Sequence, residues 1–401
     1  MPNRLKDYNI VCISSIDWGK RRERHHLLME RFSKVGLKII FIENPGTRPI
    51  SASKQDFKKS YNRVIKLFKL FRKKFIRKIS DNIYVLTPFS IPISNFKLIA
   101  KLNSFFYQRL LLSCIKRLEF QNIILWSYLP IQTVHDIVDH IDYKLLIYDC
   151  VASFSALPNS FKNIELLDNR LRRKSDIVFV DAFHLLKKEQ NLNDNTIQIP
   201  AGIDYNYYNK HVDDQIIPDD IANLTQPIIG YVGSLHQSLD LSLIRSISKS
   251  YPQYSIVLVG PKLVDIREIL NLENIHILGE KDHSEMPSYI NTFSVCIIPY
   301  YIDKFTKTVF PTKIFEYLAL GKPVISTALP EIQKFQDFDS TVEVAIDADE
   351  FIEKIKLSID NDSIELKMKR MKIAKKNTWD MRFSTMKDAI NKALNQTEIN
   401  A

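Results

Sequence analysis

The chain has 401 residues, of which 45% are hydrophobic and 25% are charged. This balance is typical of a packed globular protein with one large domain or two ordinary ones, and it excludes disordered and fibrous classes. The net charge of +10 comes from a single segment. Between Asp56 and Asp81 the chain holds ten basic residues and no acidic one, so the remainder is neutral.

No apolar run approaches the roughly 20 residues that span a bilayer, and the N-terminus lacks the pattern of a secretory signal. We therefore expect a cytoplasmic protein. The four cysteines are far apart in the sequence, which favours free buried thiols over a disulfide framework or a metal knuckle. They are Cys12, Cys114, Cys150 and Cys296.

Short apolar runs alternate with stretches of helical period, which is typical of parallel sheets covered by helices. In the first half, helices are predicted at 23–35, 96–118 and 160–174. The predicted strands of that half are 10–14, 38–42, 83–86, 123–126, 144–148 and 177–180.

The pattern of strands and helices restarts after a polar stretch at 204–226 that reads as a linker. The second set of predicted strands is 227–232, 255–259, 274–278, 295–299, 323–326 and 341–346. The sequence therefore predicts an α/β fold of two doubly wound, Rossmann-like domains that face each other across a crevice. We expect the domains at 1–205 and 206–376, with a helical tail at 377–401 that packs back on the first domain.

Polar residues that directly follow a strand are the first candidates for a site, because ligands of open α/β sheets bind beyond the carboxyl ends of the strands. Asp149 follows an apolar run at 145–148 and is a candidate general base for a hydroxyl nucleophile. An Asp that caps the following segment is the alternative. Gly233 and Ser234 follow the strand at 227–232, where a glycine lets the backbone approach a phosphate.

The segment 310–327 reads Phe-Pro-Thr-Lys-Ile-Phe-Glu-Tyr-Leu-Ala-Leu-Gly-Lys-Pro-Val-Ile-Ser-Thr. Pro311 suits the start of a helix, Lys313 lies in its first turn, and Glu316 lies on the same face one turn on. A lysine beside exposed amides suits a diphosphate, and the carboxylate can accept hydrogen bonds from ribose hydroxyls. A plain surface ion pair of Lys313 and Glu316 is the alternative.

The run from Pro311 to Val324 resembles the donor-nucleotide signature of bacterial GT-B glycosyltransferases. It is closest to the group 1, GT4-like transferases that build exopolysaccharide, teichuronic acid and lipopolysaccharide chains. Further matches follow in the same order along nearly the whole chain. They are Ser14-Ser-Ile-Asp-Trp18 with Arg24-His25-His26, Tyr148-Asp-Cys-Val151 with Phe154-Ser-Ala156, Pro200-Ala-Gly-Ile-Asp204, Gly230-Tyr-Val-Gly233, Met286-Pro-Ser-Tyr289, Ile298-Pro-Tyr300 and Trp379-Asp-Met-Arg382.

The resemblance implies a nucleotide-sugar donor, UDP- or GDP-linked, with Lys313 on its diphosphate and Glu316 on its ribose. No further cofactor is implied. The remaining donor contacts that it implies are Gly233, Ser234, Tyr300 and Thr312. It places the acceptor against the first domain, and the expected contacts there are Asp17, Trp18, Arg24 and His25.

Two departures from the family pattern leave the stereochemical outcome open. Retaining members carry a second glutamate eight residues before the ribose-binding one, where this chain has Thr308. Many members also have a basic residue just after the turn at Gly233, where this chain has Ser234-Leu-His236. The chain looks closer to the xanthan glucuronosyltransferase, in which an aspartate of the first domain acts as base. That likeness favours Asp149 in an inverting displacement.

Asp-x-Asp occurs at 347–349 and 360–362, and in the other large glycosyltransferase fold such a pair holds a divalent metal. Here Asp347 and Glu350 have the spacing of a capping box before a predicted helix at 351–359. We therefore expect a helix cap and no metal site.

On a helical wheel, residues 57–79 place aromatic and aliphatic side chains on one face and lysines on the other. A cationic helix of this kind suits the interface of an anionic membrane. A plain solvated helix and an RNA-binding segment are the alternatives, and nothing else in the chain supports RNA. The expected membrane contacts are Lys66, Phe68, Lys69, Phe71, Lys73 and Phe75.

The resemblance, together with the basic segment, implies a metal-independent, hexosyltransferase-type enzyme on the inner face of the plasma membrane. It would move a sugar to a lipid-linked or growing polysaccharide acceptor in cell-surface polysaccharide biosynthesis, and it would bind no nucleic acid. A nucleotide-sugar epimerase of the same fold is one alternative. A non-catalytic basic adaptor that binds membrane or RNA is the other.

Overall fold

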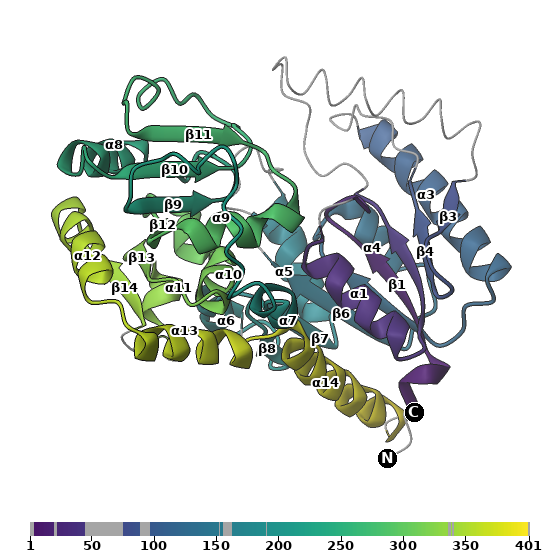
Figure 1. Ribbon diagram of the computed structural model, residues 1–401. Helices are drawn as coiled ribbons and strands as arrows, with labels where there is room; N and C mark the ends of the chain where they lie inside the picture. The colour runs from purple at the N-terminus through teal and green to yellow at the C-terminus, as the bar shows by residue number, and fades with distance from the viewer. Residues whose placement is uncertain are drawn as a thin grey trace. The chain divides into compact units, whose positions relative to one another are not determined.

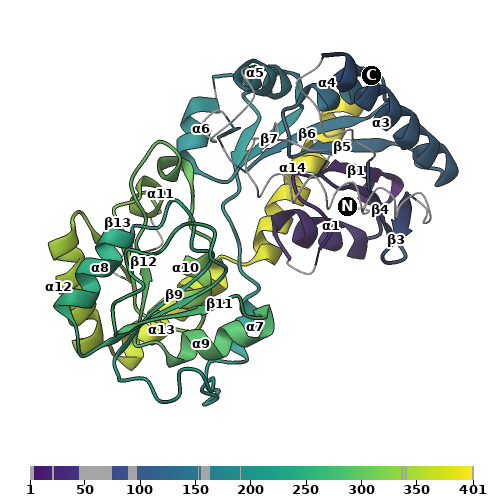
Figure 2. The same cartoon turned by 90° about the horizontal axis from the view of Figure 1, so that it is seen from above.

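A computed structural model of the chain describes residues 4–19, 22–44, 75–88, 97–151, 153–154, 163–189, 191–335, 338 and 341–399. The chain divides into two compact units, each built around its own sheet (Figures 1 and 2). Unit 1 comprises Met1–Asp181, Leu185–Ile199 and Phe383–Ala401. Unit 2 comprises Ala182–His184 and Pro200–Arg382.

Unit 1 contains an eight-stranded sheet in the order β3-β4-β2-β1-β5-β6-β7-β8. Its neighbouring strands are parallel, except for the antiparallel pair of β3 and β4 at one edge. The inner strands read as nearly continuous apolar runs because both faces of a parallel sheet are covered. The strands are β1 (Asn9–Ile13), β2 (Lys38–Ile42), β3 (Ile76–Lys78), β4 (Ile83–Leu86), β5 (Ile123–Ser127), β6 (Leu145–Cys150), β7 (Ile177–Val180) and β8 (Thr196–Gln198).

Helices connect and cover the strands of unit 1 (Figure 1). They are α1 (Arg24–Lys34), α3 (Lys97–Arg117), α4 (Gln132–Val138) and α5 (Ile164–Lys174). The long C-terminal helix α14 (Trp379–Ile399) begins in unit 2, and from Phe383 onward its residues belong to unit 1. The ring of Phe383 packs edge-on against Phe32 of α1, with 4.8 Å between ring centroids.

Unit 2 contains a six-stranded, wholly parallel sheet in the order β11-β10-β9-β12-β13-β14. The strands are β9 (Ile228–Val232), β10 (Ser255–Val259), β11 (Ile275–Gly279), β12 (Val295–Ile298), β13 (Val324–Thr327) and β14 (Val342–Ala345). The helices of unit 2 are α7 (Tyr205–Asn209), α8 (Leu241–Ser250), α9 (Met286–Thr292), α10 (Lys313–Ala319), α11 (Pro330–Gln333), α12 (Ala348–Asp360) and α13 (Ile364–Lys376).

Each sheet has one point at which the strand order reverses. In unit 1, β1 lies between β2 and β5, and in unit 2, β9 lies between β10 and β12. At such a point the connections leave the sheet in opposite directions, so the loops that follow the two central strands separate and leave room for a ligand. The fold therefore directs attention to the residues that follow β1 and β5 in unit 1, and β9 and β12 in unit 2.

The predicted fold class, an α/β fold of two doubly wound, Rossmann-like domains with a C-terminal helix that returns to the first, is confirmed. All twelve predicted strands occur, with small shifts at their ends. The four cysteines are buried and free, as expected. Asp347 accepts from the backbone N–H of Glu350 at 2.9 Å and caps α12, which confirms the predicted helix cap.

Two interpretations of the sequence are wrong. Residues 204–226 are not a free linker, because Tyr208 and Ile221 are buried in the core of unit 2. The predicted helix at 57–79 does not extend to its end, because Ile76–Lys78 forms β3. That strand pairs with β4, whose backbone groups on that side would otherwise be unpaired.

Among the described residues, no helix combines the length and the apolar character needed to cross a bilayer.

Candidate active site

In unit 2, two glycine turns meet where β9 and β10 end. Gly233 has a backbone φ of 144° and Gly260 has a φ of 149°, values that residues with a side chain rarely adopt. A Cβ atom on Gly260 would lie 2.1 Å from the carbonyl oxygen of Gly233. The two turns therefore pack backbone against backbone, which leaves the Gly233 turn without side-chain bulk at the point where the strand order reverses.

Lys313, the first residue of α10, places its ammonium group at the same turn. A Cβ atom on Gly233 would lie 2.7 Å from Lys313 Nζ. Nζ donates to the hydroxyl of Tyr231 at 3.1 Å and to the hydroxyl of Tyr300, which follows β12. It also lies 4.4 and 4.8 Å from the centroids of these two rings, within the range of cation–π attraction.

The ammonium group of Lys313 has no ion-pair partner among the Asp and Glu side chains that the structure describes. Burial raises the pKa of Tyr231, and burial together with the charge of Lys313 lowers the pKa of His236. An uncompensated positive charge beside a bare glycine turn is suited to an anionic ligand such as a diphosphate.

Glu316 lies one turn of α10 beyond Lys313 and is partly exposed. In α7, the hydroxyl of Tyr208 lies 3.4 Å from Nε2 of His283. Burial, followed by the charge of Glu316, raises the pKa of Tyr208 well above its usual value. Because the ammonium group of Lys313 has no carboxylate partner among the described residues, Lys313 and Glu316 do not pair with each other.

The structure brings Gly233, Tyr300 and Lys313 together, and it places Glu316 on the same helix as Lys313. Ser234 lies at the turn through its backbone, because its carbonyl oxygen accepts from the Tyr231 hydroxyl at 3.0 Å. Thr312 is exposed just before α10. Sequence reasoning missed Tyr208, Tyr231, Gly260 and His283. Tyrosines within or beside apolar runs indicate core packing by default, so their hydroxyl contacts leave no signal in the sequence.

In unit 1, Arg24 at the start of α1 binds Asp149 in β6 through both carboxylate oxygens. Nη2 donates to Oδ1 at 2.9 Å and Nε donates to Oδ2 at 3.1 Å. Nη1 donates to the carbonyl oxygen of Ile199 at 2.7 Å. Asp149 is fully buried and Arg24 is 8% exposed. Burial raises the pKa of Asp149 although Arg24 opposes the shift.

His25 lies at the point where the strand order of unit 1 reverses. Its Nε2 is 2.9 Å from the hydroxyl of Ser15, which follows β1, and its ring lies 3.7 Å from that of Tyr128, which follows β5. Burial, with smaller contributions from His26 and Arg24, lowers the pKa of His25 well below its usual value. His25 is therefore neutral at neutral pH and can accept or donate a hydrogen bond.

The other two predicted acceptor residues follow the same strand. Trp18 packs edge-on against His26 and Phe41, with ring centroids 5.0 and 4.8 Å apart, and Arg22 lies 5.1 Å from its ring. Asp17 is exposed.

Of the predicted membrane contacts, only Phe75 is among the described residues, and it is half-buried just before β3. The others lie outside the described residues: Lys66, Phe68, Lys69, Phe71 and Lys73.

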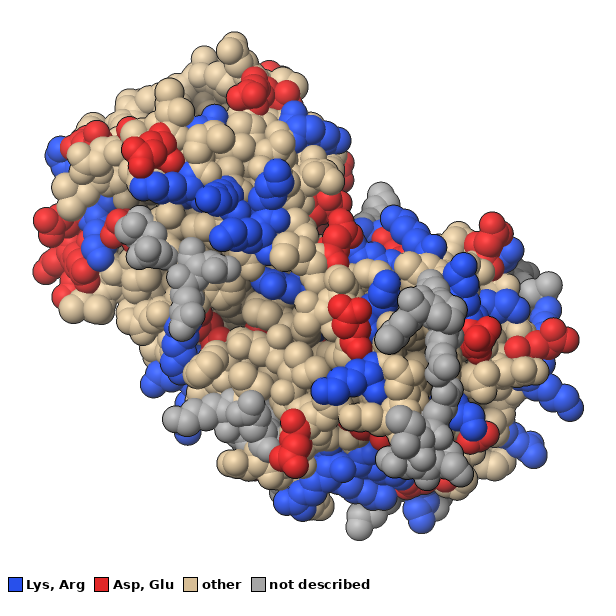
Figure 3. Space-filling model, turned by 90° about the horizontal axis from the view of Figure 1, so that it is seen from below, with Lys and Arg blue, Asp and Glu red and all other residues tan. Residues whose placement is uncertain are grey.

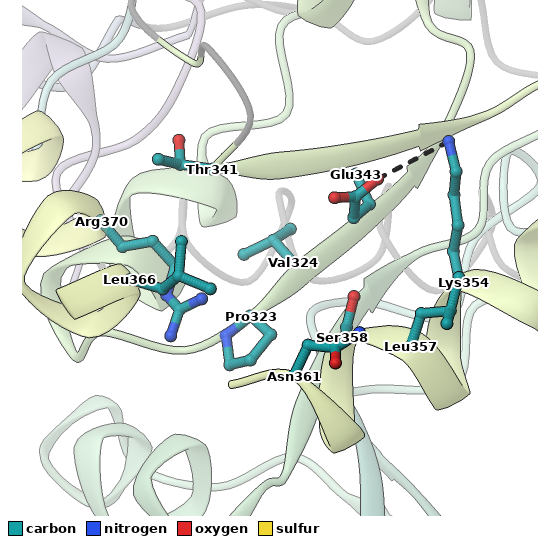
Figure 4. Close-up of a pocket in the computed structure, with 10 residues that line it drawn as sticks. All are labelled: Pro323, Val324, Thr341, Glu343, Lys354, Leu357, Ser358, Asn361, Leu366 and Arg370. Atoms are coloured by element: carbon teal, nitrogen blue, oxygen red, sulfur yellow. Dashed lines mark ion pairs between the residues drawn. The ribbon is translucent and has the colours of Figure 1, made fainter. Parts of the chain in front are cut away.

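Figure 4 shows a cavity of about 240 Å³ that lies away from these sites. It opens where β13 and β14 begin, whereas the glycine turns lie where the strands end. The two basic side chains that line the cavity already have partners. Lys354 lies 3.6 Å from the carboxylate of Glu343, and Arg370 donates to the carbonyl oxygen of Gly321 at 2.8 Å. In the part of the chain that the structure describes, no group of Asp, Glu, His and Cys side chains forms a metal centre.

Comparison with known proteins identifies a family likeness in unit 2. Residues 226–361, which include β9 through α12 and both glycine turns, match the family model described as glycosyl transferases group 1. The chain is 28% identical over 210 residues to TuaH of Bacillus subtilis (strain 168), which is named for a glycosyltransferase of teichuronic acid biosynthesis. That alignment covers 48% of this chain and 52% of TuaH, so the chain spans about half the length of this curated relative.

Solved structures extend the likeness to the whole chain. Sucrose-phosphate synthase from Thermosynechococcus elongatus matches with a TM-score of 0.70 at 13% identity, covering 97% of this chain and 100% of that one. HepE of Anabaena in complex with UDP matches with a TM-score of 0.63 at 13% identity, with coverage of 97% and 100%. At such identities the likeness shows the fold alone. The chain therefore has the GT-B fold of these solved structures, and its residues 226–361 resemble the group 1 glycosyl transferases.

Proposed function

We propose that the protein transfers a sugar from a UDP- or GDP-linked donor to a saccharide acceptor. The observation that carries this proposal is the ammonium group of Lys313 at the Gly233 turn, held by the hydroxyls of Tyr231 and Tyr300, with no carboxylate partner among the described residues. It lies within the region matched to group 1 glycosyl transferases, and a structural neighbour was solved with UDP.

Chemically, transfer breaks the bond between the sugar's anomeric carbon and the diphosphate oxygen, and forms a bond to an acceptor oxygen. Negative charge then develops on the leaving diphosphate. Lys313 lies where it can neutralise that charge, and the Gly233 turn lets the backbone approach the phosphates closely. Glu316 would accept hydrogen bonds from the ribose, and Ser234, Tyr300 and Thr312 would complete the donor contacts. With the positive charge supplied by a side chain, we propose that transfer needs no metal ion.

For the acceptor, we propose the residues of unit 1 that follow β1. Neutral His25 and exposed Asp17 would hydrogen-bond sugar hydroxyls, and Trp18 offers an apolar ring. Asp149 is the proposed base that takes the proton of the acceptor hydroxyl. Arg24 donates one hydrogen bond to each of its oxygens and so orients the carboxylate, and each oxygen keeps a second lone pair.

The acceptor would be a lipid-linked or growing polysaccharide of the cell surface, and the name of TuaH supports this class. We propose that the enzyme works at the inner face of the plasma membrane. The ten basic residues between Asp56 and Asp81 support this, and unit 2 contributes a second basic surface. Helix α13 exposes Lys369, Lys372, Lys375 and Lys376, and Figure 3 shows Lys and Arg gathered along this side of unit 2.

The test is a transfer assay with UDP- and GDP-sugars and lipid-linked acceptors, in EDTA and then with magnesium. Product that forms only when donor and acceptor are both present, and that forms in EDTA, supports the proposal. Conversion of the nucleotide sugar without an acceptor would instead reveal an epimerase. Absence of both reactions, with vesicle or RNA binding intact, would indicate the adaptor.

A further inference from the structure

Helix α3 runs along the outside of unit 1 and keeps large apolar side chains on its outer face (Figures 1 and 2). Phe105 is 50% exposed, Phe106 is 49% exposed and Leu112 is 43% exposed. The two rings pack edge-on, with their centroids 5.8 Å apart. A single exposed apolar residue is ordinary, but neighbouring aromatic rings in water on one helix face are typical of an interaction surface.

Basic side chains stand beside these apolar ones. Lys101, Arg109 and Lys116 are exposed. They alternate with Phe105 and Leu112 at steps of three or four residues, so that all five lie along one stripe of the helix. The guanidinium group of Arg109 lies 5.1 Å from the ring of Phe105. The sequence of α3 contains no Asp or Glu, so its outer face is both apolar and cationic.

The inner face of α3 holds the helix on unit 1. Tyr107, Leu111 and Cys114 are buried. The hydroxyl of Ser104 donates to the carboxylate of Asp136 in α4. Because these contacts fix the rotation of the helix about its axis, the outer apolar side chains can leave water only against something outside unit 1.

We propose that the outer face of α3 docks on an anionic phospholipid bilayer. Phe105, Phe106 and Leu112 would enter the boundary between head groups and acyl chains, and the neighbouring cations would contact lipid phosphates. This inference rests on the membrane attachment within the proposed function, and it names the element that inserts. The basic residues between Asp56 and Asp81 would attract the protein by charge, whereas α3 buries apolar surface.

Charge favours a bilayer over a second copy of this chain as the occupant of this face. Two α3 helices in contact would bring their lysines and arginines together without a carboxylate from either helix, and like charges repel each other. Lipid phosphates carry the opposite charge and lie next to the apolar layer that the rings would enter.

The first experiment measures binding of the full chain to vesicles that contain phosphatidylglycerol, by sedimentation. The double variant Phe105→Gln with Phe106→Gln keeps every charge of α3 and introduces good helix formers. We expect its partition coefficient to fall about tenfold to a hundredfold, because two half-exposed rings no longer leave water. The matched control, Leu166→Gln with Leu357→Gln, changes exposed apolar residues of α5 and α12 and should bind as the wild type does.

The second experiment measures insertion itself. The tryptophan introduced by Phe105→Trp should be quenched by vesicles with brominated acyl chains, beyond the quenching of the wild type. The tryptophan introduced by Leu166→Trp should not be quenched in this way. Absence of extra quenching for Phe105→Trp would mean that α3 does not enter the bilayer.

Three further outcomes would overturn the proposal in distinguishable ways. If the double glutamine variant binds vesicles as tightly as the wild type, charge alone attaches the protein and α3 has no part in it. If the wild type is a dimer that this variant dissociates, the face is a contact between copies of the chain. If the wild type binds no vesicles, the membrane attachment itself fails, and nucleotide binding then tests the transferase separately.

Discussion

The guanidinium group of Arg24 donates to both carboxylate oxygens of Asp149, at 2.9 and 3.1 Å, across 125 residues of sequence. Both side chains are buried, so neither can lose its partner without leaving a buried charge. The pair also reaches Ile199 through Arg24, which ties α1, β6 and the segment after β8 together. Asp149 is thus both the proposed base and the counter-ion of Arg24.

Asp149→Asn is expected to leave nucleotide affinity intact and to abolish transfer, because the amide cannot take a proton. It should also destabilise the protein by about 3–5 kcal/mol, since Arg24 then lacks its counter-ion. Transfer kinetics and urea unfolding measure the two effects. The double variant Arg24→Met with Asp149→Asn removes the buried charge. If it recovers near-normal transfer, Asp149 serves only as a counter-ion and not as the base.

Lys313→Ala removes the positive charge at the Gly233 turn. We expect the donor KM to rise and turnover to fall by about a hundredfold, because the leaving diphosphate loses its neutralising group. Lys249→Ala, which removes an exposed lysine of α8 away from the turn, is the matched control. Steady-state kinetics with the preferred nucleotide sugar measure both variants. Unchanged kinetics for Lys313→Ala would remove it from the donor site.

Gly233→Ala places a methyl group 2.7 Å from Lys313 Nζ on a backbone with φ 144°. We expect nucleotide affinity to fall at least about tenfold, which corresponds to about 1.4 kcal/mol of binding free energy. Gly36→Ala is the control, because Gly36 also has positive φ, at 106°, but meets only the flexible chain of Lys6 at 3.4 Å. Calorimetry should show normal nucleotide affinity for Gly36→Ala. Equal losses in both variants would mean that backbone strain, and not the site, is responsible.

Stability should fall as the pH drops below about 6.5, the ordinary pKa of histidine. Burial lowers the pKa of His25 in the folded protein, so below that pH the unfolded chain binds a proton that the folded protein does not. The slope is at most about 1.4 kcal/mol per pH unit for each such histidine. Urea unfolding at pH 7.5 and 5.5 measures it. His25→Gln should reduce the slope, and a slope that His25→Gln leaves unchanged would contradict this account.

Membrane attachment should depend on the basic segment. Reversing Lys66, Lys69 and Lys73 to Glu is expected to abolish flotation with vesicles that contain phosphatidylglycerol, since each lysine near an anionic surface contributes about 1 kcal/mol. The control reverses Lys34, Lys38 and Lys249, which are exposed elsewhere. Equal loss in both variants, or equal binding to neutral vesicles, would show that no specific basic surface is involved.

The sheets were predictable because their central strands are buried on both faces and read as continuous apolar runs, as Ile228–Val232 does. The edge strand β3 was not predictable. Two of its three side chains are exposed, and Arg77 pairs with Glu43 at 2.8 Å, so the segment reads as part of a charged run. Its strand conformation comes from pairing with β4, which a local pattern does not contain.

The donor site was partly predictable for a similar reason. Lys313 and Glu316 are polar residues at helical spacing next to apolar strands, so they are visible in the sequence. The same pattern did not show that the hydroxyls of Tyr231 and Tyr300 hold the ammonium group of Lys313. Likewise, Arg24 and Asp149 were each identified alone, because only the fold brings together residues so far apart in the chain.

The most direct test of the donor site is a thermal shift of the wild type and Lys313→Ala with UDP, GDP, dTDP, CMP and ADP, in EDTA. We predict that one nucleoside diphosphate stabilises the wild type, by about 2.7 kcal/mol at a hundred times its Kd, and that Lys313→Ala loses this stabilisation. A wild type that none of the nucleotides stabilises would contradict a nucleotide-sugar site at the Gly233 turn, and with it the proposed transferase.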